Sequence, residues 1–97
     1  MSEQDDLKAY QRGEAAKRIL DSELYQQAWD DVKAAIVKEW EASPQRDVEG
    51  RERLHMMLSC LKMSRKHIES HMQTGKVAAK RLSDLEARRT LRIFNNS

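Results

Sequence analysis

A heptad pattern of large side chains between residues 48 and 74 constrains the fold of this chain most. Its members follow steps of four, three, four, three and four residues, which places them on one face of a helix. They are Leu54, Leu58, Leu61, Arg65, Ile68 and Met72. Because an apolar helix face has to be buried, the pattern predicts a helix over about 48–74 that packs against a second helix.

An earlier apolar stripe supplies that second helix. Between residues 22 and 42, apolar side chains recur at steps of four, three, four and four: Tyr25, Trp29, Val32, Ile36 and Trp40. Pro44 disfavours helical geometry at Ser43, and Asp47 is suited to cap the next helix. Short connections favour antiparallel neighbours, so we predict an antiparallel helical hairpin of about 22–42 and 48–74.

The N-terminal segment predicts an additional helix over about 3–19. Ser2 is a favourable N-cap residue, and acids occupy the first turn, where the helix dipole favours them. Gly13 lies inside this segment and costs about 1 kcal/mol relative to alanine. This helix is therefore the least strongly specified of those we expect.

The C-terminal segment predicts a basic helix over about 76–92. Thr74 and Gly75 are typical of a helix end, although a helix can also continue through a single glycine. Together these segments predict an all-α fold that forms a single helical domain over 1–97.

Composition limits the core that such helices can build. Of the 97 residues, 39% are hydrophobic and 35% are charged, so the apolar interior is thin. Cys60 is the single cysteine, so no disulfide within the chain compensates for this. Small chains of this kind commonly bury helix faces against another copy or a partner, and we expect the same here.

The sequence carries no signal for export or membrane insertion. It begins with an acidic stretch without an apolar run, and no segment reaches the ~18 apolar residues of a membrane span. A lone cysteine does not point to an oxidising compartment. We therefore expect a cytosolic protein without a membrane partner.

Charge is unevenly distributed along the chain. Residues 1–50 contain seven basic and twelve acidic side chains, a net charge of −5. Residues 51–97 contain eleven basic and four acidic side chains, a net charge of +7. Such asymmetry can mark contact with nucleic acid. It can equally reflect pairing of an acidic helix with a basic one, which is the simpler explanation.

Several short motifs are similar to those of a group of phage-encoded proteins. The motifs are Arg12-Gly13-Glu14-Ala15-Ala16, Trp40 with Asp47, Arg51-Glu52-Arg53-Leu54, and Thr74-Gly75-Lys76-Val77-Ala78. Over residues 7–80 the chain resembles these short proteins, which are often encoded near packaging and head genes. The resemblance implies a phage or prophage origin and a role in particle assembly, in the host cytoplasm or in the virion. It implies no catalytic or binding residues.

The sequence contains no pattern of catalytic residues. It has no glycine-rich phosphate loop, no metalloprotease His-Glu motif, and no nucleophile beside a base at a recognised spacing. A chain that barely fills its own core also lacks walls for a closed site. We therefore predict a non-enzymatic protein without a cofactor or a small-molecule substrate.

Cys60, His67 and His71 form the best candidate metal site. Steps of seven and four residues place them along one helix face, and a thiolate with imidazoles suits zinc. However, Cys60 lies about 10 Å along the helix axis from His67, which is too far for one ion. A site would need a second copy or another helix. We therefore interpret Cys60 as a small apolar residue and the histidines as surface or interface groups, and predict no metal site.

The methionines of the 48–74 helix divide into two sets. Met57 and Met72 fit the heptad seam, and we expect them in the core. Met56 and Met63 lie off the seam, seven residues apart on one side of the helix. A soft-metal site is one explanation for so many methionines. Because methionine adapts to irregular contacts, Met56 and Met63 better indicate a second contact surface.

Arg65 occupies a seam position where an apolar residue is expected. It can form a salt bridge with an acid of the preceding helix, in the same chain or another, which would fix register or oligomeric state. Alternatively, its stem is buried while its charge reaches water. Trp29 and Trp40 are suited to anchor an interface but can equally belong to the core. The predicted protein-interface residues are Trp29, Trp40, Met56, Met63, Arg65, Ile68 and Met72.

Basic residues concentrate in the C-terminal segment. They are Lys76, Lys80, Arg81, Arg88, Arg89 and Arg92. A helix that tracks phosphates needs such groups, and its binding would weaken as salt rises. Apart from Phe94, however, the segment lacks aromatic residues for base stacking, and no helix-turn-helix or zinc-finger spacing is present. A solvated or acid-paired basic face is therefore the favoured interpretation.

These observations favour a non-enzymatic helical interaction or assembly protein that forms an oligomer or binds a larger phage or host protein. The alternative is a nucleic-acid-associated packaging accessory that uses the basic C-terminal half. A small enzyme or a metal-loaded sensor is the third hypothesis. The expected partner is thus a protein, with nucleic acid as the alternative.

Overall fold

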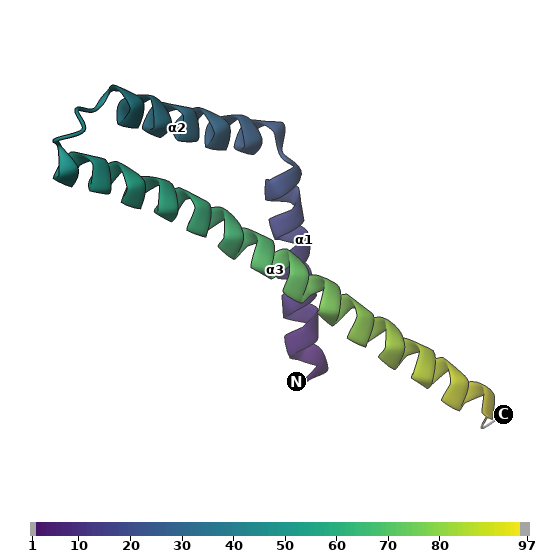
Figure 1. Cartoon of the computed structure of the whole chain (residues 1–97). Coiled ribbons are helices and arrows are strands. Elements are labelled where there is room, and N and C mark those ends of the chain that lie inside the picture. The colour runs from purple at the N-terminus through teal and green to yellow at the C-terminus, as the bar shows by residue number, and fades with distance from the viewer. Residues whose placement is uncertain (1, 96–97) are drawn as a thin grey trace. The chain divides into compact units, whose positions relative to one another are not determined.

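The computed structural model describes residues 2–95, and this part of the chain consists of three α-helices without a strand. The helices are α1 (Glu3–Asp21), α2 (Glu23–Ala42) and α3 (Val48–Asn95) (Figure 1). The predicted all-α fold is therefore confirmed. Across residues 2–95, no helix has the length and apolar character needed to cross a membrane. Met1, Asn96 and Ser97 belong to the predicted domain but lie outside the described residues.

Each helix begins at a side chain that caps it. Ser2, Ser22 and Asp47 each accept a hydrogen bond from the backbone N–H three residues further along, at 3.1, 3.3 and 3.1 Å respectively. Each bond satisfies one of the N–H groups that a helix start leaves without an intrahelical partner. The caps predicted at Ser2 and Asp47 are therefore confirmed, and Ser22 is the cap of α2.

α3 continues where the sequence predicts a helix end. It runs through Thr74 and Gly75 to Asn95, so the predicted stop is wrong and the basic segment is the C-terminal part of the same helix. Gly75 does not adopt the positive φ angle that a glycine cap needs. It is instead buried against another helix, where the missing Cβ allows a close approach.

The chain divides into two compact units, and α3 contributes to both. One unit contains Met1–Arg18 and Glu69–Ser97, so α1 packs with the C-terminal part of α3. The other contains Ile19–Ile68, so α2 packs with the N-terminal part of α3. The expected single domain over 1–97 stays a prediction.

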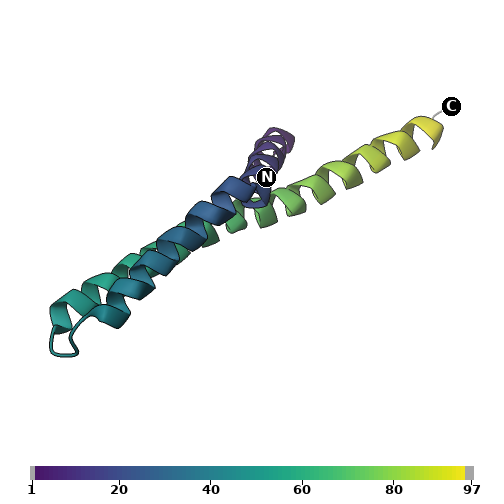
Figure 2. The same ribbon diagram turned by 90° about the horizontal axis from the view of Figure 1, so that it is seen from above.

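In the unit Ile19–Ile68, α2 and the N-terminal part of α3 lie side by side and antiparallel (Figure 1 and Figure 2). The indole Nε1 of Trp29 donates a hydrogen bond to the carbonyl oxygen of Leu61 at 3.4 Å, which ties the two helices together. Ile36 is buried between them, with 6% of its surface exposed. The predicted antiparallel hairpin is therefore confirmed.

Arg51 closes the turn between α2 and α3. Its guanidinium lies 4.0 Å from the centroid of the Trp40 ring. It also donates hydrogen bonds to the carbonyl oxygen and the hydroxyl of Ser43, at 3.3 and 3.1 Å. α2 ends here because Ser43 is extended ahead of Pro44, with φ −72° and ψ 142°. Arg51 thus supplies a partner for the carbonyl end of α2 from the first turns of α3.

In the unit Met1–Arg18 with Glu69–Ser97, α1 crosses α3 at two glycines. A Cβ atom on Gly13 would lie 2.7 Å from the Cα of Gly75 and 3.0 Å from the carbonyl oxygen of His71. A Cβ atom on Gly75 would likewise lie 2.7 Å from the Cα of Gly13. Since ordinary contacts of a Cβ atom begin at 3.4 Å, the two backbones approach closely only because both residues are glycine.

Alanines occupy the buried positions next to these glycines along the two helices. Ala16 of α1 and Ala78 of α3 expose 5% and 1% of their surfaces. Small side chains let the helix backbones meet directly, so dispersion contacts between main chains replace a core of large side chains. The crossing therefore depends on the small size of its residues.

Candidate protein-interaction surface

The face of α3 that meets α2 contains the predicted heptad seam from Leu54 to Ile68, whereas Met72 belongs to the unit with α1. Leu58 and Leu61 are half-buried there. The guanidinium carbon of Arg65 lies 4.8 Å from the centroid of the Trp29 ring of α2. The π electrons of an indole attract such a cation by about 0.5–1 kcal/mol at an exposed site. The sequence predicts an acid or water as the partner of this charge, and the ring is a partner that residue spacing did not reveal.

The side of α3 that faces away from α2 carries a second row of side chains, termed here the outer stripe. It consists of Met56, Cys60, Met63 and His67. Met56 and Met63 expose 65% and 68% of their surfaces, and Cys60 and His67 are also exposed. Both methionines thus lie off the seam, as predicted. Their role in binding a partner stays a prediction.

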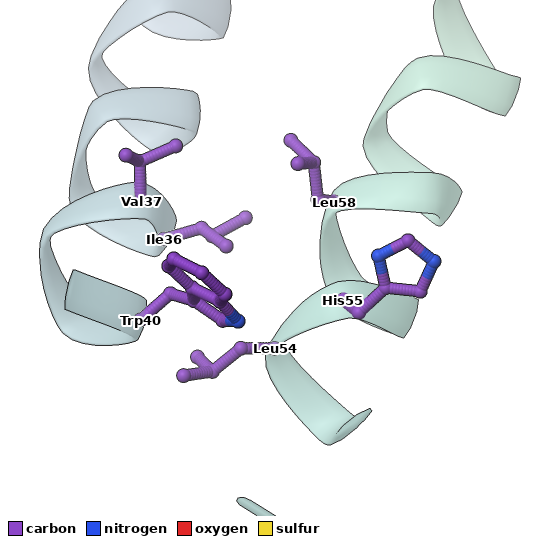
Figure 3. Close-up of a pocket in the computed structure, with 6 residues that line it drawn as sticks. All are labelled: Ile36, Val37, Trp40, Leu54, His55 and Leu58. Carbon is purple, nitrogen blue, oxygen red and sulfur yellow. The ribbon is translucent and has the colours of Figure 1, made fainter. Parts of the chain in front are cut away.

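A groove of about 190 Å³ opens between α2 and α3 near the turn (Figure 3). Its lining residues are Ile36, Val37 and Trp40 of α2 and Leu54, His55 and Leu58 of α3. Trp40 is 44% exposed and forms part of the groove wall. The sequence did not indicate Val37 and His55 as groove residues, because they flank the apolar stripes instead of belonging to them. The groove suits an apolar side chain, and its one titratable lining residue offers no pair for acid–base catalysis.

Met57 lines a second groove of the hairpin, together with Val32 and Ala35 of α2. Met57 and Val32 expose 50% and 48% of their surfaces. The prediction that Met57 belongs to the core is therefore wrong. A single neighbouring helix covers the centre of an apolar stripe and leaves its edges open, and both residues lie at such edges.

The other predicted interface residues have less accessible surface. Trp29, Ile68 and Met72 are half-buried. Met72 lines a groove of about 220 Å³ between α1 and the C-terminal part of α3, beside Tyr10. Among the predicted interface residues, the two methionines of the outer stripe are therefore the most accessible to another molecule.

Acidic side chains of α1 pair with basic side chains of α3. The Glu3 carboxylate accepts two hydrogen bonds from Arg89, at 2.8 and 3.0 Å. These bonds, together with the guanidinium charge, lower the pKa of the Glu3 carboxyl group. Asp6, with 6% of its surface exposed, pairs with Arg81 at 3.4 Å. The uneven charge of the sequence thus reflects, at least in part, the pairing of an acidic helix with a basic one.

The remaining residues of the predicted nucleic-acid surface are exposed. They are Lys76, Lys80, Arg88 and Arg92. Sixteen residues separate the first from the last, which places them about 160° apart around a regular helix. These four groups therefore do not form one straight row toward a phosphate backbone, and nucleic-acid binding stays a prediction.

The candidate metal residues are separated along α3. Cys60 is exposed, whereas His71 is half-buried where α1 crosses α3. Among residues 2–95, no three His, Cys, Asp or Glu side chains gather where they could share a metal ion.

No protein-family model, curated protein or solved structure matches this chain. Function is therefore inferred from the residues and surfaces of the chain itself. Of these surfaces, the outer stripe combines strongly exposed methionines with the regular spacing of a helix that binds another helix.

Proposed function

We propose that this chain is a non-enzymatic helical interaction protein that binds another protein chain through α3. The observation that carries the proposal is the exposure of Met56 and Met63, at 65% and 68%, on the side of α3 that faces away from α2. Burial of apolar surface contributes about 25 cal/mol per Å², so a partner that covers both side chains gains free energy. Methionine also adapts its shape to a partner.

The thin interior of the hairpin supports this proposal. Within Ile19–Ile68, Ile36 is the one buried residue, with 6% of its surface exposed. Two helices that bury so little side-chain surface are stabilised weakly by their own contacts. A partner that covers Trp40 and the neighbouring groove would add the apolar contact that the hairpin lacks, and tryptophan is a common interface anchor.

The biological setting that we propose is assembly of a phage particle, in the host cytoplasm or in the virion. The short motifs that resemble phage-encoded proteins are its support. The partner would be another copy of the chain or a larger phage or host protein.

A nucleic-acid packaging accessory is the alternative proposal. It is supported by exposed basic groups on the C-terminal part of α3. The ion pairs of Arg81 with Asp6 and Arg89 with Glu3 weigh against it, because two of the six candidate basic groups already have acidic partners. Phosphates would have to compete with these carboxylates. Protein binding is therefore the function that the surfaces favour.

Photo-crosslinking in producing cells tests the main proposal. A photoreactive p-benzoylphenylalanine replaces Met63 in the full chain, and the matched control carries it at Glu41, an exposed residue of α2. We expect discrete protein adducts from position 63 and few from position 41. Equal adducts from both positions, or adducts to nucleic acid alone, would contradict the proposal.

Titration of the purified chain with duplex DNA separates the alternative. A nucleic-acid accessory would bind DNA with an affinity that falls steeply as salt rises, and Lys76→Ala or Lys80→Ala would weaken it. We expect instead that neither substitution changes a weak, nonspecific affinity. A strong affinity with a steep salt dependence would favour the alternative.

A further inference from the structure

The outer stripe has the spacing of a heptad seam. Met56, Cys60, Met63 and His67 follow steps of four, three and four residues, as the seam toward α2 does. All four side chains are exposed. A helix that carries two such rows on different sides can pack against one helix on each side, and α2 covers only the first row.

Two opposite charges lie along one edge of the outer stripe. Glu52 and Lys66 are fourteen residues apart, with Ser59 halfway between them. Ser59 and Lys66 each come one residue before a member of the stripe, and Glu52 comes one residue before Arg53, where the same spacing continues through two charged residues, Arg53 and Glu49. The side chains of Glu52 and Lys66 are exposed. In an antiparallel pair of helices, this edge of one helix faces the same edge of the other, and charges there set partner choice and orientation. In an antiparallel pair of two α3 helices, Glu52 of each copy would therefore face the partner subunit's Lys66, so the pairing of opposite charges occurs twice.

A parallel pair would not match these charges. In that orientation this edge faces the opposite edge of the second helix, where Met57 and His71 occupy the corresponding positions. Glu52 and Lys66 would then lack partners of opposite charge. In the antiparallel pair, Met57 meets Met57 of the other copy, which covers a side chain that is 50% exposed in one chain.

We propose that this side of α3, from Glu49 to His67, binds the same side of a second copy of this chain, with the two α3 helices antiparallel about a twofold axis beside Ser59. This inference rests on the proposed function, because it names the protein that α3 contacts. Each Met56 then packs opposite the partner subunit's Cys60, a large side chain against a small one. In the same register, Met63 lies opposite the partner subunit's Arg53, and His67 lies opposite the partner subunit's Glu49. A contact of this kind is self-complementary, as twofold symmetry requires.

The length of the contact predicts a reversible dimer. From Glu49 to His67, the outer stripe and its charged continuation span about 27 Å of helix, which is between two and three heptads. An interface formed by one helix from each copy is small compared with those of permanent dimers. We therefore expect a dimer fraction that rises with protein concentration.

A charge-reversal series tests the proposed pairing. Glu52→Lys alone, or Lys66→Glu alone, places like charges opposite each other twice per dimer, and each should weaken the dimer about tenfold at low salt. The double variant restores opposite charges and should restore the affinity. Sedimentation of the full chain measures each dissociation constant. Glu41→Lys, an exposed reversal on α2, is the matched control and should leave the dimer unchanged.

A cysteine placed opposite Cys60 tests the register. Met56→Cys puts a thiol next to the partner subunit's Cys60, so mild oxidation should give a covalent dimer on a non-reducing gel. The same substitution with Cys60→Ser should not, because two copies of position 56 lie about 6 Å apart along the axis. The unmodified chain should crosslink slowly for the same reason. All substituted positions are exposed, so circular dichroism should show unchanged helix content.

Each contrary outcome overturns a defined part of the inference. A chain that stays monomeric at high concentration overturns the dimer, and protein adducts at position 63 in cells would still support the proposed function. Rapid Cys60 crosslinking in the unmodified chain indicates a parallel pair, which overturns the antiparallel one. A dimer uses another surface if the charge reversals leave its dissociation constant unchanged and Met56→Cys gives no covalent dimer. That outcome also overturns the proposal.

Discussion

Replacing Gly13 with alanine tests whether α1 and α3 depend on direct backbone contact where they cross. The new Cβ atom would lie 2.7 Å from the Cα of Gly75, whereas ordinary contacts begin at 3.4 Å. The two helices would therefore have to separate by about 0.7 Å, the difference between these values. The second obstacle, the carbonyl oxygen of His71 at 3.0 Å, also belongs to the main chain. Neither atom can move away by a side-chain rotation.

Two opposing contributions determine the free energy of unfolding of this variant. Alanine stabilises a helix interior by about 1 kcal/mol relative to glycine. Overpacking costs about 1–3 kcal/mol, and the upper end applies because the obstacles are backbone atoms of a second helix. The expected net destabilisation is about 2 kcal/mol. For a chain of this size, that corresponds to a Tm lower by about 8–16 °C.

Thermal and urea unfolding measure the effect. Far-ultraviolet circular dichroism reports all three helices, whereas fluorescence reports Trp29 and Trp40 of the unit Ile19–Ile68. We expect Gly13→Ala to lower the stability seen by circular dichroism. Gly50→Ala is the matched comparison, because its Cβ would meet only the Asp47 carboxylate, a side chain that can rotate. Loss of the Asp47 cap and the gain in helix propensity are each worth about 1 kcal/mol, so this variant should change little. A Gly13→Ala variant that is about 1 kcal/mol more stable than the parent would show helix propensity alone and refute the contact.

Three further substitutions have defined outcomes. Arg89→Ala removes the hydrogen bonds and charge that lower the pKa of the Glu3 carboxyl group, so an NMR titration should show that pKa rising toward its ordinary value. Because the pKa of Glu3 is lowered in the folded chain, the pair stabilises the fold above the ordinary carboxyl pKa, and this stabilisation is lost as pH falls through the lowered pKa. An unchanged Glu3 titration in Arg89→Ala would contradict the pair. Ile36→Ala should lower the free energy of unfolding by about 2–3 kcal/mol because it leaves a cavity at a buried site. The control Val32→Ala, at a half-exposed site, should lower it by less than about 1 kcal/mol. Equal losses for the two variants in urea unfolding would argue against a core at Ile36. Arg51→Ala removes the contact with the Trp40 ring and the hydrogen bonds at the turn, so it should lower the free energy of unfolding by about 1–2 kcal/mol and shift the tryptophan emission. An unshifted emission spectrum would show that Arg51 does not stack on Trp40.

Local signals in the sequence were sufficient to locate the helix starts and the turn. Ser2, Ser22 and Asp47 cap helices because a short side-chain oxygen can reach a free backbone N–H, whatever lies elsewhere in the fold. Pro44 ends α2 because it restricts the residue before it. The heptad spacing likewise predicted the hairpin, since an apolar face has to be buried.

The candidate interaction surface was predicted in part. Met56 and Met63 could be assigned to an accessible side of the helix because seam spacing defines which positions face away from it. Met57 could not, because its exposure depends on how wide a stripe the neighbouring helix covers. The interaction of Arg65 with the Trp29 ring also depends on the register of α2 against α3, which heptad spacing within each helix does not specify.

Gly75 shows most clearly where the sequence alone is insufficient. A glycine after Thr74 suits a left-handed helix cap as well as a close helix crossing, because the absence of a Cβ permits both. Only packing against Gly13 selects the second use, and α3 consequently continues to Asn95. Asp6 is similar: its position in the first turn of α1 indicates only a favourable contact with the helix dipole, whereas in the structure it is buried and pairs with Arg81. The sequence by itself determined which segments are helical and which faces are apolar, because backbone propensities, caps and spacing act locally. The tertiary structure decided where two backbones meet and which charges pair, because those contacts join residues far apart in the chain.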